Sequence, residues 1–362
     1  MKARTRKATM TNKERVEALL RREKPDRVPF AAGGGGFAAN YNGVPPADRY
    51  TKPEVMYEAE KKTCRDFDWV FTPSFTTSRS YRAAFGSKMK IPTSQYSQGQ
   101  FVTKYAVETE EEVMALKVPD PKIIAGLTAE EMALYQRSCR EKDENQPFKI
   151  SFYGLGVMNI AGTIAGADKL CKWMIKRPEV AHRLLRLAAD YEIATAQYFK
   201  DTFGVERVLP TGANAYASNQ LISPKHFEQF ALPYLKEVHE KILAMGFKHL
   251  RTHPCGEQNL NLPYWQQVPM GDPGIFHVGN EIDLETAAAY FPNDIIGGNL
   301  DTTVIQSGTP EEVYQEAKKV IEQGKHLPTG FILIPACELP PMAPVANIRA
   351  ITRALNDFGW YD

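Results

Sequence analysis

A histidine and a cysteine stand one residue apart in the segment His253-Pro254-Cys255, and a second cysteine, Cys337, follows far downstream. Residues 247–251 are predicted to form a strand, which Pro254 and Gly256 end. Alternation along an extended backbone puts the side chains of residues 253 and 255 on the same side. Both can therefore face one metal ion.

Cys337 follows a second short apolar segment, residues 330–335. Imidazole and thiolate are ligands that zinc prefers, and three protein ligands with a long gap between them are typical of a catalytic zinc with an exchangeable position. Structural zinc usually has four ligands in two tight pairs. Free cysteines and hydrogen-bonded histidines are also common in protein cores. The three residues are therefore either a zinc site or ordinary core residues.

The composition predicts a globular chain with no strong electrostatic preference. Its 362 residues are 43% hydrophobic and 24% charged, enough for a large core, and the net charge is +1. This balance gives no reason to expect nucleic-acid or membrane binding. The basic start of the chain lacks an apolar segment, so we expect a loose N-terminus over residues 1–10 and a cytoplasmic protein. Five scattered cysteines disfavour a disulfide framework.

Short apolar segments alternate with long amphipathic ones along the chain, which is typical of βα units. Eight strands are predicted, ending near residues 30, 71, 152, 210, 253, 278, 296 and 336. Helices are predicted over residues 12–22, 178–203, 224–245, 284–290 and 310–323. We therefore expect an α/β TIM (β/α)8 barrel in a single domain over residues 11–362, with an N-terminal extension and an inserted arm or lid over about residues 93–146. Catalytic groups of such barrels lie at the C-terminal strand ends, where His253, Cys255 and Cys337 fall.

Two other motifs have competing interpretations. Residues 33–38 fit a variant dinucleotide-binding fingerprint, but Asn40, Asn42 and Pro45 are expected to break the helix that this motif needs, so a flexible loop is predicted. Asn299 and Asp301 follow a predicted strand end. They either bind a ligand there or cap a turn.

Several segments, in order along nearly the whole chain, resemble the uroporphyrinogen decarboxylase superfamily. These are Lys13-Glu14-Arg15-Val16, Pro25-Asp26-Arg27-Val28-Pro29, Leu221-Ile222-Ser223-Pro224, Gly298-Asn299-Leu300-Asp301, Gly308-Thr309-Pro310-Glu311-Glu312-Val313 and Pro344-Val345-Ala346-Asn347-Ile348. The resemblance implies a TIM barrel, in agreement with the strand count.

Within this superfamily the chain is similar to the methylcobamide:thiol (coenzyme M) methyltransferases, whose zinc motif is His-x-Cys followed far downstream by Cys. It differs from the decarboxylases in two places. Residues 28–48 lack the arginine-rich loop that grips substrate carboxylates and contain Gly33 to Gly36 instead. The aspartate after the next strand is replaced by the hydroxyl residues Ser74, Thr76, Thr77 and Ser78.

The resemblance implies a zinc-dependent methyltransferase, with zinc held by His253, Cys255 and Cys337. The methyl group would come from a corrinoid, a methylcobamide carried by a small corrinoid protein, and would go to a thiol or to tetrahydrofolate. A further glutamate ligand of relatives falls near Gly279, so Glu281, or Glu257, is a candidate. Residues expected to line the substrate or corrinoid site are Phe37, Tyr41, Asn214, Tyr216, Asn299 and Asp301.

Two alternatives remain open from the sequence. One is a lyase of the decarboxylase type that acts on another acid. The other is a module that binds a corrinoid without catalysis.

Overall fold

The structure is a computed structural model, and it describes residues 7–73, 81–97, 99–120 and 128–361. The hydroxyl residues Ser74, Thr76, Thr77 and Ser78 lie outside the described residues. No described helix combines the length and the apolar character that crossing a membrane would require.

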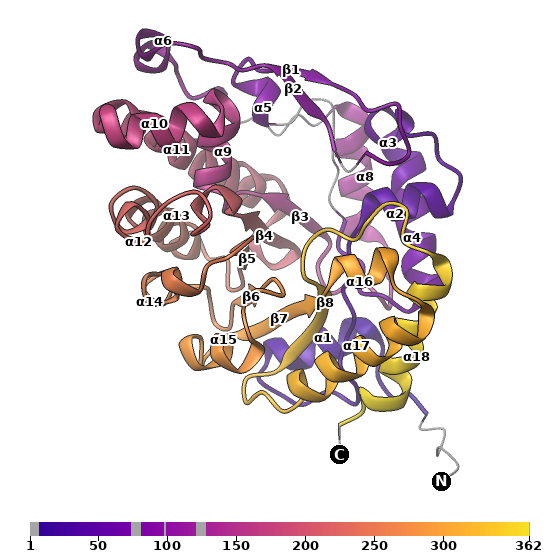
Figure 1. Cartoon of the computed structure of the whole chain (residues 1–362). Helices are drawn as coiled ribbons and strands as arrows, with labels where there is room; N and C mark the ends of the chain where they lie inside the picture. Colours follow the sequence, from indigo (N-terminus) through magenta and orange to yellow (C-terminus); the bar gives the residue numbers. More distant parts are fainter. Residues whose placement is uncertain (1–6, 74–80, 98, 121–127, 362) are drawn as a thin grey trace.

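Six parallel strands form the central sheet, in sequence order from β3 to β8. They are β3 (Ile150–Tyr153), β4 (Val208–Ala213), β5 (Arg251–His253), β6 (Ile275–His277), β7 (Ile295–Leu300) and β8 (Phe331–Pro335). Within this sheet each strand forms its ladder with its neighbours along the chain, and helices connect the strands (Figure 1). The predicted α/β fold is therefore confirmed.

The first two predicted strands do not form hydrogen-bonded ladders. Phe30 makes one parallel bridge to Leu333 of β8. The backbone amide of Val70 donates to the carbonyl of Phe30 (2.7 Å), and that of Ser151 in β3 donates to the carbonyl of Pro73 (2.8 Å). The two segments thus bridge the gap between β8 and β3 with isolated bonds, and Pro73, which has no backbone N–H, cannot extend a ladder.

A layer of helices covers the outside of the sheet (Figure 1). The α-helices of the described residues are α1 (Asn12–Leu20), α2 (Gly35–Tyr41), α3 (Asp48–Thr51), α4 (Pro53–Phe67), α5 (Tyr81–Ala84), α6 (Glu110–Ala115), α8 (Ala129–Arg140), α9 (Val157–Ala165), α10 (Ala167–Lys176), α11 (Pro178–Phe203), α12 (Pro224–His226), α13 (Leu232–Ala244), α14 (Leu262–Trp265), α15 (Leu284–Tyr290), α16 (Thr302–Ser307), α17 (Pro310–Gly324) and α18 (Val345–Phe358). The helix predicted over 224–245 is interrupted by a π-helical segment, Phe227–Ala231. Those predicted over 178–203 and 284–290 have the predicted bounds.

The flexible loop predicted around the glycine run is wrong from residue 35 onward. Gly34 adopts a left-handed conformation (φ 96°), which glycine tolerates, and helix α2 begins directly after it. Asn42 ends this helix, and its side-chain amide donates to the carbonyls of Ala38 and Ala59. The residues expected to prevent a helix therefore end a short one.

The stretch predicted as an arm or lid divides into two parts. The antiparallel pair β1 (Lys88–Lys90) and β2 (Phe101–Lys104), with α6, lies over the edge of the barrel near α9 and α10 (Figure 1). Helix α8 instead belongs to the outer helical layer: Tyr135 packs against Phe199 and Phe203 of α11, and Ser138 donates to the carbonyl of Lys149. The predicted arm therefore extends too far along the chain.

The described part of the N-terminal extension is anchored to the barrel at residues 9 and 10. The backbone amides of Thr9 and Met10 both donate to Oδ2 of Asp26 (2.8 and 3.0 Å). Residues 9 and 10 of the N-terminus predicted to be loose are therefore held by hydrogen bonds, and residues 1–6 lie outside the described part of the chain.

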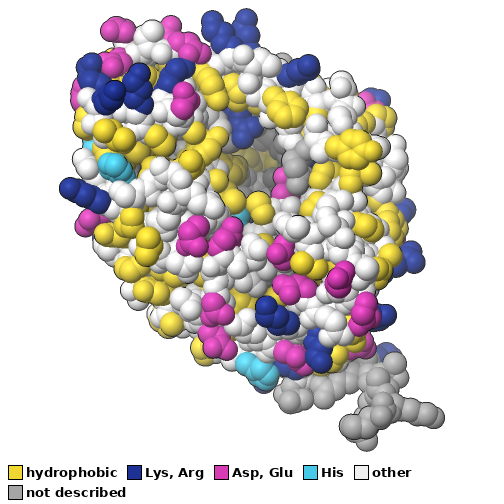
Figure 2. Space-filling view, in the orientation of Figure 1, with side chains coloured by type: hydrophobic (Ala, Val, Ile, Leu, Met, Phe, Trp, Pro, Cys, Tyr) yellow, Lys and Arg dark blue, Asp and Glu magenta, His cyan; other side chains and the backbone are white. Residues whose placement is uncertain are grey.

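The face of the molecule in Figure 2 is hollowed near its centre, beneath the part of the chain that carries α5 and β2 in Figure 1. Apolar side chains stand on the rim of the hollow, and charged and histidine side chains are visible inside it or at its edge.

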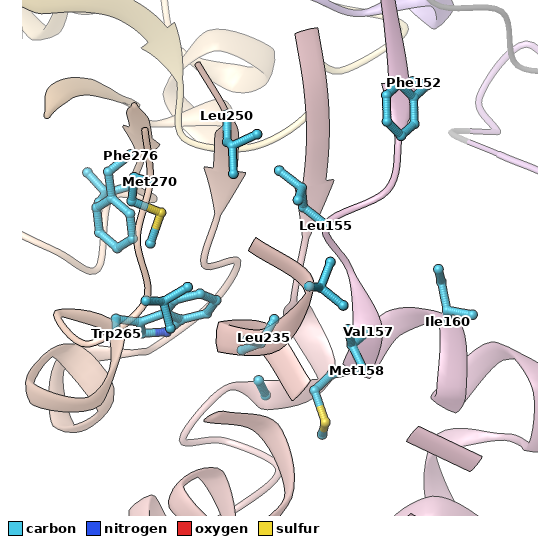
Figure 3. Packing of buried hydrophobic residues seen from close by; sticks show 14 of the residues in the cluster. Phe152, Leu155, Val157, Met158, Ile160, Leu235, Leu250, Trp265, Met270 and Phe276 are labelled. Atoms are coloured by element: carbon cyan, nitrogen blue, oxygen red, sulfur yellow. The ribbon is translucent and has the colours of Figure 1, made fainter. Parts of the chain in front are cut away.

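The main apolar core lies between the strands and their covering helices. Phe152, Leu155 and Leu250 come from the strands and the segments that flank them, and Leu235 and Trp265 come from the helical layer (Figure 3). These side chains are buried. At about 25 cal/mol per Å² of buried apolar surface, such a layer holds the strand ends in fixed positions. The site is built on these ends.

Candidate metal centre

His253, Cys255 and Cys337 lie together at the C-terminal edge of the sheet. His253 is the last residue of β5, and each cysteine lies two residues beyond its strand, Cys255 after β5 and Cys337 after β8. One potential ligand atom from each residue lies within 4.8 Å of the other two. Parallel strands end at the same edge of a barrel, so residues distant in sequence meet here.

The imidazole of His253 is oriented by a backbone carbonyl. Its Nδ1 atom donates to the carbonyl oxygen of His277 at 2.8 Å, which leaves Nε2 unprotonated in the neutral ring. Nε2 is buried and has no hydrogen-bond partner in the structure. A buried nitrogen lone pair without a donor is costly, and a metal ion would satisfy it, because histidines that bind metals usually donate their other ring N–H in this way.

The thiols of Cys255 and Cys337 lie 3.8 Å apart, sulfur to sulfur. The hydrogen bond between them raises the pKa of Cys255, and burial adds to this. The same bond, together with the nearby His253, lowers the pKa of Cys337. The hydrogen bond between the two sulfur atoms thus favours the thiolate form of Cys337, and thiolates are ligands of soft cations.

The separations fit a tetrahedral metal ion. Zn–S bonds of about 2.3 Å in a tetrahedron place two sulfur atoms about 3.8 Å apart. The observed Sγ–Sγ distance of 3.8 Å has this value without any rearrangement. Two thiolates and an imidazole can thus hold a zinc ion through three of its four positions.

A cavity of about 560 Å³ opens beside these three residues. Its walls include the glycine run, with Gly33 and Gly34, and inward-facing residues of the strands such as Tyr153, Thr211 and Ile334. The interior of a TIM barrel is usually filled by side chains. Here the space reaches from the metal ligands down between the strands, so a small molecule can reach the ligands from within the barrel.

One wall of the cavity carries charged side chains. Arg49 forms an ion pair with Glu338, the residue after Cys337, at 3.0 Å. Glu60 lies nearby, and burial raises its pKa to about 7, although Arg49 acts in the opposite direction. Burial also raises the pKa of Glu338. The loop after the first strand lacks arginine, but α3 supplies one to the same space.

Arg251 is a cavity residue that the sequence interpretation missed. It is the first residue of β5 and lines the cavity two positions before His253. Burial lowers its pKa from the ordinary value. The signal was present in the sequence, since residues 251, 253 and 255 alternate onto one side of an extended chain.

Phe37 and Tyr41, which were predicted to line a binding site, are not part of the wall of this cavity. The Phe37 side chain is 2% exposed and packs against Phe67 and Trp69, with ring centroids 5.8 and 5.9 Å apart. Tyr41 stacks on Phe37 and donates its hydroxyl to Asp66. Because residues 35–41 form a helix, the Phe37 ring is buried in the core, and the partly buried Tyr41 ring packs against it.

Asn214 and Tyr216 also serve the scaffold. Asn214 is fully buried, donates from its side chain to the carbonyl of Leu155, and receives a hydrogen bond from Gln258 at its own carbonyl. The Tyr216 ring lies over Gly162 of α9, where a Cβ atom would stand 2.1 Å from it. Neither residue is part of the cavity wall. They fix the loops that follow β3 and β4.

Asn299 and Asp301 hold turns at the end of β7, which was one of the two interpretations of these residues. The amide of Asn299 donates to the carbonyls of Gly279 and Ile282. Asp301 caps α16 through the backbone amide of Thr303 at 2.7 Å. Neither lines the cavity.

Glu281 is exposed and does not belong to the group of atoms within 4.8 Å of one another. Its charge contributes to the raised pKa of Cys255, so it lies near the thiols. Its role as a further metal ligand remains a prediction.

Strand ends, a cavity and the group of His253, Cys255 and Cys337, which could hold a metal ion, define an α/β barrel protein with a candidate metal centre. The chain belongs to the uroporphyrinogen decarboxylase family, since the sequence model of the family Uroporphyrinogen decarboxylase (URO-D) matches residues 11–358.

Among its relatives are methyltransferases and a decarboxylase. The chain is 26% identical to methylcobamide:CoM methyltransferase MtbA from Methanosarcina acetivorans over 96% of this chain and 98% of the relative. It is 23% identical to a uroporphyrinogen decarboxylase from Anaeromyxobacter sp. over 85% and 86%. A solved methyltransferase from Methanosarcina mazei superposes with a TM-score of 0.79 at 19% identity over 96% of this chain and 99% of that one, which shows that the fold is shared.

Proposed function

We propose that this protein is a zinc-dependent methyltransferase that moves a methyl group from a methylated corrinoid to a thiol. The observation that carries the proposal is the ligand set at the cavity: the free Nε2 atom of His253 and two thiols whose sulfur atoms lie 3.8 Å apart. The full-length relatives named methylcobamide:CoM methyltransferase support the same class of reaction.

The proposed reaction balances as a displacement at carbon. The sulfur of the acceptor bonds to the methyl carbon, the cobalt–carbon bond breaks, and its electron pair stays on cobalt, which goes from cobalt(III) to cobalt(I). The acceptor thiol releases one proton. A zinc ion held by His253, Cys255 and Cys337 would favour that release by binding the thiolate form, since free thiols with a pKa near 8.5 are mostly protonated at neutral pH.

The chain's own contribution is orientation and space. The carbonyl of His277 holds the His253 ring, and the strands hold the two cysteines, so the ligands need no reorganisation when a substrate arrives. Gly33, Gly34 and Gly35 form part of one cavity wall, and because they carry no side chain they leave space for a ligand there. Sulfur, carbon and cobalt can then align across the mouth of the cavity.

The methyl donor in this proposal is a methylcobamide carried by a small corrinoid protein. Large apolar side chains stand exposed on segments near the cavity: Tyr96 is 70% exposed, Phe101 53%, Leu221 47% and Leu260 64%. Phe101 directly follows Gln100 of the cavity wall, Tyr96 and Leu221 lie on loops, and Leu260 lies in the short 3-10 helix Asn259–Asn261. Exposed apolar residues around a cavity suit a partner that must bring a broad, partly apolar cofactor to it.

The test is demethylation of methylcobalamin under anaerobic conditions. The zinc-loaded protein, mixed with methylcobalamin and a small thiol, should generate cob(I)alamin, which is followed by its absorption spectrum. The rate should fall at least about 10- to 100-fold in His253→Ala, because the substitution removes a metal ligand. His249→Ala, at the other end of the strand region, is the matched control and should keep the rate.

The result also decides between acceptors and classes. If a panel of thiols gives no zinc-dependent demethylation, the thiol is wrong as acceptor, and tetrahydrofolate is tested next. Cobalamin binding without turnover to either acceptor would indicate a binding module. Release of carbon dioxide from an acid by the chelated protein would indicate a lyase.

A further inference from the structure

Arg251 stands inside the barrel, one layer below the metal ligands. Along β5 the side chains alternate: Thr252 faces outward, with its hydroxyl 3.4 Å from Nε2 of His239 in α13, whereas Arg251 and His253 face the cavity. A strand rises about 3.3 Å per residue, so these two inward residues lie about 6.6 Å apart along the strand.

The guanidinium of Arg251 has no carboxylate partner among the described residues. The structure gives its side chain one hydrogen bond, from Nη2 to Nδ1 of His277 at 3.4 Å. The geometry fixes the roles, because Nε2 of His277 donates to the carbonyl of Pro335 and leaves Nδ1 as the acceptor. A guanidinium stays charged in proteins and carries five N–H donors. Most of its donors are therefore free to face the cavity.

Other arginines of the cavity wall differ in this respect. Arg49 is ion-paired with Glu338 at 3.0 Å. A buried charge without a counterion is expensive, and proteins normally pair it. An unpaired guanidinium that faces a cavity can take its counterion from a bound ligand, and arginine is well suited to bind carboxylates and similar anions.

The position of the methyl donor determines where the rest of the acceptor can go. A corrinoid can approach only from the open mouth of the cavity, so the acceptor sulfur must face that mouth. The remainder of the acceptor then points away from the mouth, into the barrel. There it meets Arg251, which contacts His277, whose ring stacks on His253 at a centroid distance of 4.3 Å.

We propose that Arg251 forms an anion-binding subsite below the metal centre, which takes the carboxylate or sulfonate end of a short acceptor thiol. This inference rests on the proposed function for the thiol, but the subsite itself needs only the anionic end. The short distance between Arg251 and His253 along β5 favours an acceptor with two or three carbons between sulfur and anion. Long or uncharged thiols are then poor acceptors.

The first experiment tests the subsite without the reaction. Ethanesulfonate and propionate, which carry the anion but no thiol, are titrated into the metal-free protein by calorimetry. The wild type should bind at least one of them, and the affinity should fall about 10- to 100-fold in Arg251→Met, because charge-assisted hydrogen bonds are lost. Arg251→Lys, which keeps the charge but not the planar fork, should be intermediate. Arg186→Met, which removes a half-buried guanidinium from α11, should bind like the wild type.

The second experiment uses the zinc-loaded protein and compares acceptors. Arg251→Met should raise the KM for 2-mercaptoethanesulfonate or 3-mercaptopropionate about 10- to 100-fold and leave the KM for uncharged 2-mercaptoethanol within about twofold. The acceptor whose KM rises more identifies the preferred anion. Zinc content and thermal unfolding of each variant show that the effect is local, and Arg251→Lys serves if the methionine variant does not fold.

The outcomes separate this inference from the proposed function. Anion binding that depends on Arg251, with no methyl transfer to any thiol, supports the subsite and refutes only the proposal that a thiol is the methyl acceptor. No anion binding by the wild type, or binding that survives Arg251→Met, overturns the subsite even if methyl transfer proceeds. Binding lost in Arg49→Met but kept in Arg251→Met also overturns it.

Discussion

The Nδ1 atom of His253 lies 2.8 Å from the carbonyl oxygen of His277, and the two imidazole rings stack with centroids 4.3 Å apart. His277 in turn donates from Nε2 to the carbonyl of Pro335 at the end of β8, two residues before Cys337. His277 of β6 thus sets the tautomer of His253 through its backbone carbonyl. Through its side chain it also links β6 to the end of β8, the strand that precedes Cys337. The burial of His277 lowers its pKa well below the ordinary value, so it stays neutral in this role.

Replacing His277 should therefore weaken metal binding although His277 itself does not contact the ion. In His277→Phe the ring can still stack, but the bond to Pro335 is lost. We expect zinc affinity, measured by competition with a chromophoric chelator, to fall about 10- to 100-fold. His249→Phe is the matched control, since it removes a similar bond from a histidine to the carbonyl of Pro273 away from the site. Equal zinc affinity in both variants would contradict the supporting role.

The metal itself gives a second prediction. A zinc-replete preparation should contain about one zinc per chain, with bonds of about 2.0–2.3 Å by X-ray absorption. Cys255→Ala and Cys337→Ala should each lose most of this zinc, because two remaining ligands bind it poorly. Cys171→Ala removes a half-buried thiol on α10 and should keep it. Stoichiometric zinc that survives both ligand substitutions would refute the assignment.

The fold could be predicted from the sequence wherever the signal was local. Helix α11 has the predicted bounds because Pro178 begins it and Gly204 ends it, with an apolar face between them. Helix α8 was misassigned to an arm, since its packing against α11 is a contact between segments distant in sequence. The first two predicted strands do not form regular ladders, because an apolar pattern cannot indicate how many backbone hydrogen bonds a segment makes with its neighbours.

The candidate site divides in the same way. The positions of His253, Cys255 and Cys337 followed from strand alternation and from the common edge of parallel strands. Phe37 was misplaced, because an aromatic side chain in a supposed loop can equally belong to the core, and only the helix beginning at Gly35 decides which. Arg49 and Glu60 come from α3 and α4, and no local pattern indicates that they reach the cavity.

A third prediction concerns the reaction of other family members. Uroporphyrinogen carries many carboxylates, and the segment between residues 28 and 48 has no arginine to bind them. Arg49 already has Glu338 as its partner, and two carboxyl groups, Glu60 and Glu338, stand on the same wall and disfavour a polyanion. An anaerobic assay should detect no conversion to coproporphyrinogen. Detectable conversion would overturn the proposed methyl transfer as the main activity.

The last prediction concerns stability and its dependence on pH. Glu192 is fully buried in α11, and its Oε1 atom accepts a hydrogen bond from the backbone amide of Gly156. Its Oε2 atom has no partner in the structure. Burial raises the pKa of Glu192 from 4.5 to about 8. The folded protein therefore keeps this carboxyl group protonated at neutral pH, whereas the unfolded chain ionises it.

The sign follows from proton binding. Below pH 4.5 both states hold the proton, and between pH 4.5 and about 8 only the folded state does, so the free energy of unfolding falls as pH rises. The slope from this group is about 1.4 kcal/mol per pH unit at most. Glu192→Gln keeps an oxygen for Gly156 but cannot ionise. Relative to the wild type it should gain roughly 2–4 kcal/mol of stability between pH 5 and pH 8.

Denaturant unfolding at pH 5, 6, 7 and 8 measures this difference. The difference in unfolding free energy between variant and wild type at each pH excludes the contributions of the other titrating groups, which are the same in both proteins. Both proteins are measured metal-free, so that metal binding does not contribute. Glu228→Gln, which changes an exposed glutamate within the π-helical segment, is the control and should follow the wild type at every pH. If Glu192→Gln also follows the wild type, then Glu192 is ionised in the folded protein, and an unrecognised partner compensates its charge.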